Sequence, residues 1–385
     1  MKVVNPEVTI VGAGIAGCVA ALGLGMAGRR VLLLERSSNI AEKGSDFLKP
    51  RGIRVLQGLG VLDELLRNGA IKRHRIRYFH DGELLFELDY REMTYVGYFL
   101  IVPYPILIRS LLTAMTKMPN VEVRFETKIG SMKLDSDQRL VLQLEDGNQI
   151  QSQIVIGADG SRSQVRQALG LRRDSCLGPH LFYAVELPST PSVWESNRMY
   201  FSSAGLAAYF YPFRQNRARA FLIMTPQQES LLRSHAGHLA EALEVFVTES
   251  DDVLPLLPRI GSFFKYRPEI FLLDTYSRGN AVLLGSAAFS INPLTGQGMN
   301  LAIEDSDALK ENLLSYFEGE VDLSHMMQTY FAARHAVHLE IIDYGRRTAD
   351  FHDRSAYSTH FDPRFHGGEP GKSWKVVPTN LQTKL

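Results

Sequence analysis

The chain has 385 residues, which at ~150 residues per domain is enough for two or three domain-sized units. Basic and acidic residues both number 42, so the formal net charge is zero and gives no electrostatic reason to expect nucleic acid or an anionic membrane as partner. Hydrophobic residues make up 45% and charged residues 22%, a composition that excludes a disordered or collagen-like chain. The two cysteines, Cys18 and Cys176, form neither a disulfide framework nor a metal-ligand pattern. We therefore expect a cytoplasmic protein without a bound metal.

An uncharged stretch between Glu7 and Arg29 is long enough to span a bilayer. A glycine-rich turn signal lies inside it, and it lacks the basic start and the short apolar core of a signal peptide. We therefore expect no transmembrane segment.

This stretch and the residues directly after it predict a strand, a glycine turn, a helix and a second strand that ends at an acidic residue. The apolar run Val8–Val11 leads into Gly12-x-Gly14-x-x-Gly17, and a second apolar strand ends at Glu35. Gly12 allows a tight turn, Gly14 lets the backbone approach a pyrophosphate, and Gly17 lets the helix lie against the strand. The helix N-terminus attracts phosphate, and Glu35 can accept hydrogen bonds from a ribose. This βαβ unit predicts FAD or NAD, and not NADP, as the first nucleotide.

A second copy of the glycine spacing, Gly23-x-Gly25-x-x-Gly28, lies inside the expected helix and has no strand before it. Its context predicts close helix packing and no ligand.

The remaining elements follow in chain order. Residues 41–68 have helical spacing, residues 76–102 alternate around an Asp81-Gly82 hairpin turn, and residues 105–118 form a helix. A small meander over 121–147 precedes a buried strand at 154–156. The segment 181–271 is aromatic and strand-like, with one helix at Leu239–Thr248. After a last strand at 281–284, a long helical stretch runs from about 299 toward 348, and a loosely ordered tail follows. In that tail we expect His352, His360 and His366 at the surface.

Two downstream motifs indicate which dinucleotide binds. Residues 154–161, followed by Val165-Arg166, resemble the "DG" motif of the class A flavoprotein aromatic hydroxylases, the para-hydroxybenzoate hydroxylase family. Residues 281–300 resemble the "GD" motif and the flavin-contacting loop of that family. The three motifs stand in the family's order, and the resemblance covers nearly the whole chain to about residue 345. Residues 44–55, 80–85 and 205–212 also look like the branch that contains the aromatic-amine N-hydroxylase of alkylquinolone N-oxide biosynthesis.

The resemblance implies an α/β fold: a three-layer, Rossmann-like FAD-binding domain, an inserted β-sheet substrate domain and a C-terminal helix. It places the discontinuous FAD-binding domain at 1–75, 100–175 and 272–348. The substrate domain then comprises 76–99 and 176–271, and the tail comprises 349–385.

The resemblance also implies cofactor contacts. The amides at the start of the last helical stretch would face the flavin pyrimidine edge, and Pro293 would form the wall beside the ring. Asp159 and Arg109 would reach the pyrophosphate or ribityl region, and Arg36 the adenine. The full set of candidate cofactor residues is Gly12, Gly14, Gly17, Glu35, Arg36, Arg109, Asp159, Ser286, Pro293, Gly298, Met299 and Asn300. Four aromatic residues, which could otherwise be plain core, are candidates for a flat substrate pocket: Tyr98, Phe201, Tyr209 and Tyr211.

One motif departs from the family pattern, at two positions. The family has Gly-Asp-Ala-Ala-His where this chain has Gly285-Ser-Ala-Ala-Phe289. The family aspartate accepts a hydrogen bond from a ribityl hydroxyl, and Ser286 is shorter and uncharged. We therefore expect FAD to bind more weakly than is usual for the family.

The activity implied is an FAD-dependent monooxygenase that hydroxylates a small aromatic or aromatic-amine substrate, as in secondary metabolism, using NAD(P)H as a transient reductant, dioxygen and a flavin hydroperoxide. Because the flavin carries the reaction, no catalytic side chain is obligatory. A flavin-dependent halogenase would be expected to contain a WxWxIP-type signature. The two tryptophans, Trp194 and Trp374, are far apart in sequence, which argues against this alternative. A non-catalytic or partner-dependent flavin-fold protein remains the other alternative. The oligomeric state stays open.

Overall fold

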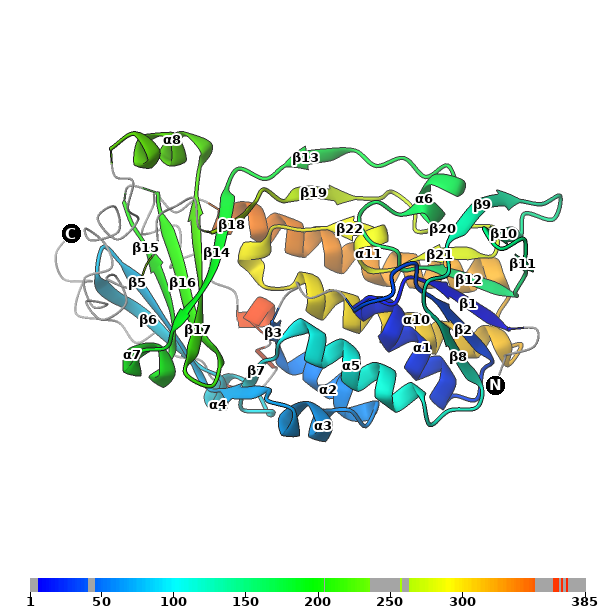
Figure 1. Ribbon diagram of the computed structural model, residues 1–385, viewed down its shortest axis with the longest axis horizontal. Coiled ribbons are helices and arrows are strands. Elements are labelled where there is room, and N and C mark those ends of the chain that lie inside the picture. Colours follow the sequence, from blue (N-terminus) through cyan, green and yellow to red (C-terminus); the bar gives the residue numbers. More distant parts are fainter. Residues whose placement is uncertain are drawn as a thin grey trace.

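The computed structural model describes residues 6–40, 46–203, 205–235, 257, 263–349, 363–366, 368–369 and 372. The molecule is elongated, with a helix-covered parallel sheet at one end and a second, larger sheet at the other (Figure 1). The predicted helix at 239–248 lies outside the described residues, as do His352 and His360.

A parallel sheet organises the first part. Its strand order is β20-β21-β12-β1-β2-β8, and only the edge strand β20 runs antiparallel. The strands are β1 (Val8–Val11), β2 (Val31–Leu34), β8 (Val121–Arg124), β12 (Ile154–Gly157), β20 (Ser277–Arg278) and β21 (Ala281–Leu283). Every residue of β1, β2, β12 and β21 is buried, as expected for central strands covered on both faces.

Strand β8 corrects the sequence-based prediction, which placed residues 121–125 in the small meander. Residues Val121–Arg124 instead pair in parallel with β2, because the preceding helix α5 (Tyr104–Met115) is a crossover that returns the chain in the direction of β2. The meander consists of β9 (Ile129–Leu134), β10 (Leu140–Leu144) and β11 (Gln149–Ile150).

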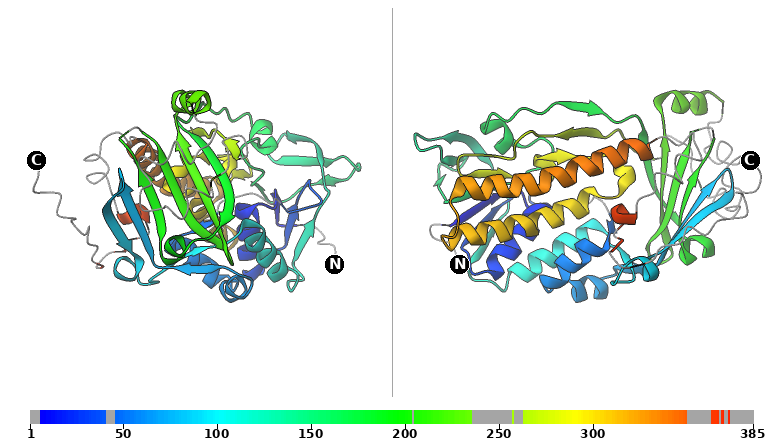
Figure 2. Two further views of the ribbon diagram at one scale, coloured as in Figure 1. Left: turned by 60° about the vertical axis from the view of Figure 1, so that its left-hand side comes forward. Right: turned by 180° about the vertical axis from the view of Figure 1, so that it is seen from behind.

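Helices cover one face of the parallel sheet. Helix α1 (Ile15–Met26) packs between α5 and α10 (Gly298–Phe317), and α11 (Leu323–Thr348) runs beside α10 (Figure 2). The predicted long helical stretch is thus two helices, because Gly319 turns the chain with φ 76° and Asp322 caps the second helix by accepting from the His325 amide. The meander belongs to the same hydrophobic core, so this part has three layers.

Glycines inside α1 pack closely, as the second glycine copy predicts. A Cβ added at Gly25 would overlap Val121 of β8, and one at Gly23 would lie 3.1 Å from the Lys310 side chain of α10. Both are therefore packing positions.

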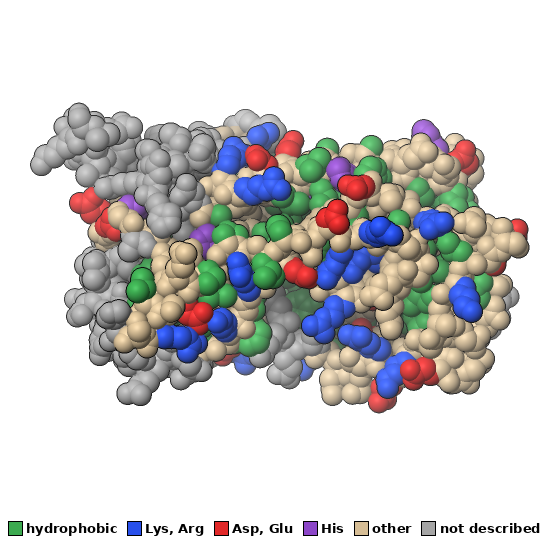
Figure 3. Space-filling view, turned by 90° about the horizontal axis from the view of Figure 1, so that it is seen from above, with side chains coloured by type: hydrophobic (Ala, Val, Ile, Leu, Met, Phe, Trp, Pro, Cys, Tyr) green, Lys and Arg blue, Asp and Glu red, His purple; other side chains and the backbone are tan. Residues whose placement is uncertain are grey.

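Short elements connect this part to the second sheet. Helices α2 (Pro50–Gly58) and α3 (Leu62–Arg67) lie beside a small sheet of β3 (Phe47–Leu48), β7 (Phe99–Ile101) and β4 (Ile71–Arg73). On the opposite side, β13 (Ser175–Leu177) and β19 (Glu269–Leu272) form a long ribbon with β22 (Phe289–Ser290), next to α6 (Gln164–Ala168). Figure 3 looks onto this upper side, where Lys and Arg side chains gather near the middle of the face.

The second sheet has seven strands in the order β18-β14-β17-β16-β15-β5-β6. They are β5 (Arg75–His80), β6 (Glu83–Asp89), β14 (Leu181–Pro188), β15 (Asn197–Phe201), β16 (Ala207–Arg214), β17 (Arg217–Met224) and β18 (Phe264–Tyr266). The β5–β6 turn is the predicted Asp81-Gly82 hairpin, with both residues at positive φ. Helices α4 (Tyr90–Met93), α7 (Pro191–Glu195) and α8 (Pro226–His235) flank it.

The two faces of this sheet carry separate hydrophobic cores. One core contains Phe79, Tyr200 and Phe210, and the other contains Tyr78, Phe201 and Tyr211. The second core also includes Phe47 of β3 and Leu294 near the start of α10, so this face is turned toward the parallel-sheet part. We call it the inner face.

His366 corrects another prediction. It lies in the short 3-10 helix η6 (Pro363–His366), between the helices of the first part and the second sheet (Figure 2). Its Nε2 is 2.9 Å from the Tyr344 hydroxyl, and the residue is buried rather than at the surface. Periodicity could not show this because the contact joins a short tail segment to a distant helix.

A buried polar clamp joins β3 to the start of α10. The Asn300 side chain accepts from the Lys49 amide (2.7 Å) and donates to the carbonyl groups of Phe47 and Gly296. The Lys49 ammonium donates to the Thr295 carbonyl (2.8 Å). Burial lowers the pKa of Lys49 to about 7, although nearby Glu304 opposes this shift.

We expect Gly17→Ala to destabilise the protein by about 1–3 kcal/mol or more, as for an overpacked core. A Cβ at this position would overlap the Gly12 carbonyl oxygen, and backbone cannot move aside cheaply. Urea unfolding measures the change. The matched control is Gly58→Ala, at the exposed end of α2, where an added Cβ meets no atom within 4 Å. Equal stabilities of the two variants would contradict the close packing.

Lys49→Met tests the buried amine through pH. Between about pH 7 and the usual lysine range, the folded protein has already lost the Lys49 proton while the unfolded chain still holds it. Stability contributed by this site therefore rises with pH across that window and is lowest below it. The difference in unfolding free energy between wild type and Lys49→Met should grow in favour of wild type as pH rises. If the unfolding free energies of wild type and Lys49→Met change with pH in the same way, the pKa of the Lys49 amine is not lowered.

Candidate functional site

Three motifs that are far apart in sequence meet at the carboxyl end of the parallel sheet. Gly12 has φ 104°, and an added Cβ would lie 2.5 Å from the Ala158 carbonyl oxygen at the end of β12. A Cβ at Gly285, after β21, would lie 3.0 Å from that of Ala16 in the first turn of α1. Open α/β sheets bind their ligands at this edge. The backbone is therefore close-packed around one candidate nucleotide site.

The N-terminus of α1 faces this site. Gly14 is the N-cap residue and supplies no capping side chain. The Tyr104 hydroxyl, from the first residue of α5, accepts a hydrogen bond from the Ile15 amide (3.2 Å). Burial raises the pKa of Tyr104 to about 12. Sequence analysis missed Tyr104, because nothing local to the Val-Pro-Tyr-Pro segment shows that it reaches the glycine loop.

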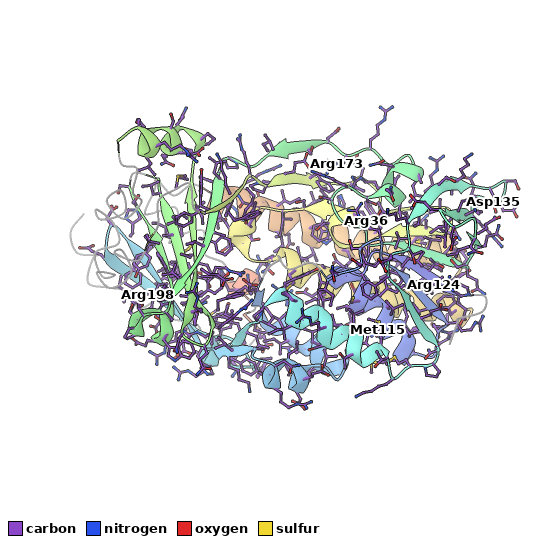
Figure 4. All side chains as sticks on the ribbon, in the orientation of Figure 1. Arg36, Met115, Arg124, Asp135, Arg173 and Arg198 are labelled. Atoms are coloured by element: carbon purple, nitrogen blue, oxygen red, sulfur yellow. The ribbon has the colours of Figure 1, made fainter. Side chains whose placement is uncertain are left out.

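Glu35 ends β2 beside the glycine loop. Its two carboxylate oxygens accept from the amides of Ala13 and Ser37, each at 2.9 Å. Next to it, Arg36 is exposed and lines a cavity of about 680 Å³ together with residues 37–39, Glu126, Lys128 and Glu145. Figure 4 places Arg36 near the parallel sheet and Arg198 in the second sheet, at the other end of the molecule. The cofactor roles of Glu35 and Arg36 stay predictions.

Asp159 follows β12 and organises the next helix. Its Oδ2 accepts from the amides of Gln164 (2.6 Å) and Val165 (3.2 Å). Its Oδ1 is buried and has no hydrogen-bond partner within the described part of the chain. A buried carboxylate oxygen without a donor is costly, so Asp159 fits a site completed by a ligand hydroxyl. Arg166 of α6 donates to the Ala287 carbonyl (2.9 Å) and ties this motif to the Gly285 turn.

The two residues that depart from the family pattern, Ser286 and Phe289, lie in different environments. Ser286 is exposed within the short helix η4 (Gly285–Ala287), at the edge of the site. Phe289 is buried and stacks on His338 with ring centroids 3.9 Å apart. His338 in turn contacts Asp305 (2.9 Å) and the Tyr276 hydroxyl (2.7 Å). Position 289 is thus part of the packing between β22 and α11, whereas position 286 faces the site.

The loop before α10 supplies backbone donors. Pro293–Thr295 form a 3-10 turn (η5), Gly296 has φ 58°, and α10 begins at Gly298. The amides of Gly298, Met299 and Asn300 lie in the first turn, where they have no intrahelical acceptor. Gly298 is exposed, whereas Met299 and Asn300 are buried and the Asn300 side chain is used by the clamp to β3. We call residues 293–298 the flavin loop, after the contact that the family resemblance implies for them.

The structure separates the four aromatic candidates. Phe201, Tyr209 and Tyr211 share the inner face of the second sheet. Tyr98 lies apart and packs against the core of the parallel-sheet part, with the Lys72 ammonium 4.6 Å from its ring centroid. Arg109 is exposed on α5, and within the described residues no hydrogen bond or ion pair connects it to the motifs above.

A buried carboxylate that sequence analysis missed lies beside the inner face. Asp46 precedes β3, accepts from the Tyr211 hydroxyl (3.0 Å) and forms an ion pair with Arg219 of β17. Burial raises the pKa of Asp46 to about 6, against the opposing effect of Arg219 and Tyr211. The pair joins the second sheet to the strand that is clamped to the flavin loop. The chain spacing from 46 to 219 contains no signal of it.

No described helix is long and apolar enough to cross a membrane. The residues placed by the structure also contain no cluster of three or more His, Cys, Asp or Glu side chains suited to a metal ion.

Comparison with known proteins agrees with this geometry. Residues 5–344 match the family model described as FAD binding domain. The crystal structure of Pseudomonas aeruginosa PqsL in complex with 2-aminobenzoylacetate superposes with a TM-score of 0.88 at 34% identity, covering 93% of this chain and 100% of PqsL. Kynurenine 3-monooxygenase from Xanthomonas campestris pv. campestris (strain 8004) is 27% identical over 356 residues, covering 85% of this chain and 75% of that enzyme.

A third relative is 3-demethoxyubiquinol 3-hydroxylase from Escherichia coli (strain K12), 28% identical over 328 residues, or 80% of each chain. NAD(P)H is the standard reductant of such enzymes. The family match covers most of the chain, and the glycine turn, the Asp159 motif and the flavin loop converge at one edge of the sheet. The chain therefore belongs to the FAD-binding family of class A flavin monooxygenases and is an FAD-dependent monooxygenase.

Proposed function

We propose that this enzyme hydroxylates a small aromatic or aromatic-amine substrate that lies between the inner face of the second sheet and the flavin loop. One observation supports this place above others. Among the described residues, seven side chains packed against the inner core keep some accessible surface, and four of them are Phe47, Tyr209, Phe221 and Leu294. These four come from β3, β16, β17 and the flavin loop, so accessible apolar surface is shared by both sides of one interface.

The residues around the flavin loop fit FAD. The free amides of the first α10 turn can donate to the pyrimidine edge, where charge gathers on reduction, and Asp159 Oδ1 can accept from the cofactor. When bound, FAD supplies the reduction and oxygen-transfer chemistry. The chain itself holds the ring, stabilises this charge and keeps water from the apolar interface.

The similar structures support an aromatic substrate. PqsL was crystallised with 2-aminobenzoylacetate, and the named activities of the other relatives concern kynurenine and demethoxyubiquinol. We infer that residues 76–99 and 176–271 serve as the substrate domain, and that 1–75, 100–175 and 272–348 hold the cofactor. The cytoplasm remains the expected compartment on the basis of sequence alone.

A turnover assay tests the proposal. The FAD-loaded enzyme should oxidise NADPH or NADH faster with 2-aminobenzoylacetate or 2-aminobenzoate than without. The product should contain one oxygen atom from isotopically labelled dioxygen. Free FAD without the protein is the control. A chain that never takes up flavin, or that consumes reductant without labelling any aromatic compound, would contradict the proposal.

Ser286→Asp tests the departure from the family pattern. Restoring a carboxylate next to the ribityl chain adds one charge-assisted hydrogen bond of about 1.5–3 kcal/mol, so FAD should bind roughly ten- to a hundredfold more tightly. Titration by flavin fluorescence measures both dissociation constants. Ser324→Asp, at the exposed start of α11, adds the same charge away from the site and should leave the affinity unchanged. Equal affinities of wild type and Ser286→Asp would refute this expectation.

A further inference from the structure

Tyr209 occupies a central place on the inner face, and the inference below rests on the proposed function of that face. It lies on β16 between Met199 of β15 and Phe221 of β17. Its ring centroid is 5.0 Å from that of Tyr211. Unlike its buried neighbours Phe210 and Tyr211, Tyr209 keeps accessible surface. Part of the Tyr209 side chain is therefore accessible at the interface, while burial raises the pKa of its hydroxyl.

The hydroxyl of Tyr209 is held by a buried amide. Asn197 Nδ2 lies 2.7 Å from the Tyr209 oxygen, and Arg73 Nε lies 3.0 Å from Asn197 Oδ1. The rest of the Arg73 guanidinium donates to the carbonyl groups of Trp194 (2.6 Å) and Val193 (3.2 Å). Arg73 and Asn197 are both buried. The three side chains form one hydrogen-bonded chain from Arg73 through Asn197 to Tyr209.

The chemistry of these groups sets the direction of each hydrogen bond. A guanidinium has donors only, so the atom of Asn197 that faces Arg73 must be the carbonyl oxygen. The amide nitrogen then faces Tyr209 and donates to the phenol oxygen. The phenol oxygen is an acceptor in this bond, so its own proton points elsewhere.

That proton has no acceptor within the described chain, where Asn197 is the one hydrogen-bond partner of the Tyr209 hydroxyl. Tyr211 differs, because its hydroxyl donates to Asp46. Burial raises the pKa of Tyr209, so the phenol keeps its proton at neutral pH. A buried donor without an acceptor is costly, so a donor of this kind beside a partly accessible aromatic ring is a recognition element for a ligand.

We propose that Tyr209 donates a hydrogen bond to an acceptor oxygen of the aromatic substrate, such as a ketone or carboxylate oxygen. Arg73 and Asn197 act as positioning residues that fix this donor direction. The site then selects aromatic compounds that carry an acceptor oxygen over those that lack one, because a compound without it would leave the Tyr209 proton unpaired.

Asn197→Asp replaces the amide donor that faces the Tyr209 hydroxyl with an acceptor oxygen, with almost no change in side-chain shape. A carboxylate still pairs with Arg73, but it can only accept, so the Tyr209 proton turns toward residue 197. Binding of 2-aminobenzoate to the oxidised, FAD-loaded enzyme should weaken about ten- to a hundredfold, the effect of one hydrogen bond to a charged group. Binding of aniline, which has no acceptor oxygen, should change less than about threefold, within the scatter of single-contact effects. Calorimetry or the change in flavin absorbance measures both affinities without turnover.

Two further variants complete the test. Tyr209→Phe removes only the donor and should lose the same preference for 2-aminobenzoate over aniline, which keeps the inference testable if Asn197→Asp folds poorly. Asn216→Asp adds an identical charge at the exposed β16–β17 turn and should bind both compounds as wild type does.

The outcomes separate this inference from the proposed function. If wild type binds 2-aminobenzoate and both variants bind it equally well, Tyr209 is not the donor and the inference is overturned. If wild type binds neither aromatic compound, the proposed substrate interface itself fails, and the inference fails with it. Loss of the preference in both variants, with normal thermal midpoints, supports the assigned direction of the hydrogen bonds.

Discussion

Close backbone contact at the carboxyl edge of the parallel sheet is the constraint on which the remaining structure depends. Gly12 lies against the Ala158 carbonyl, and Gly17 lies against Gly12 itself, so neither position has room for a side chain. This contact holds β1, α1 and β12 together and directs the α1 N-terminus toward the nucleotide site. Helix N-termini attract phosphate only when nothing bulky covers them, so the glycines decide both packing and affinity.

Polar contacts connect this edge of the parallel sheet to the second sheet. Asn300 and Lys49 fasten β3 to the flavin loop, and Asp46, directly before β3, pairs with Arg219 of β17. A cofactor ring at the flavin loop and a substrate on the inner face would thus be held by one connected set of buried groups. Because Asn300, Lys49 and Asp46 are desolvated, removing the partner of any one of them costs more than the contact itself contributes.

Some positions of the candidate cofactor site match the family pattern, whereas Ser286 and Phe289 depart from it. Within the described residues, Asp159 Oδ1 has no hydrogen-bond partner, and the amides in the first turn of α10 have no intrahelical acceptor. At Ser286 the charged partner used elsewhere in the family is absent, while Phe289 has become part of the packing against His338. The family chemistry is therefore retained on a scaffold whose hold on FAD is expected to be weaker at the ribityl chain and unaltered at the backbone donors.

Local spacing alone determined the βαβ unit, the Asp81-Gly82 hairpin and the buried strands, because each depends on residues close together in the chain. The two downstream cofactor motifs were identified by their resemblance to the family. Longer contacts were decided only by tertiary structure. Residues 121–124 joined the parallel sheet because a crossover helix returned them beside β2, and His366 was buried because η6 packs against Tyr344. Tyr104, Asp46 and Asn197 became visible as site residues only when partners 89, 165 and 124 positions away were brought to hydrogen-bonding distance. Sequence pattern encodes which face of an element is buried, but the identity of the partner across a fold depends on how whole elements pack.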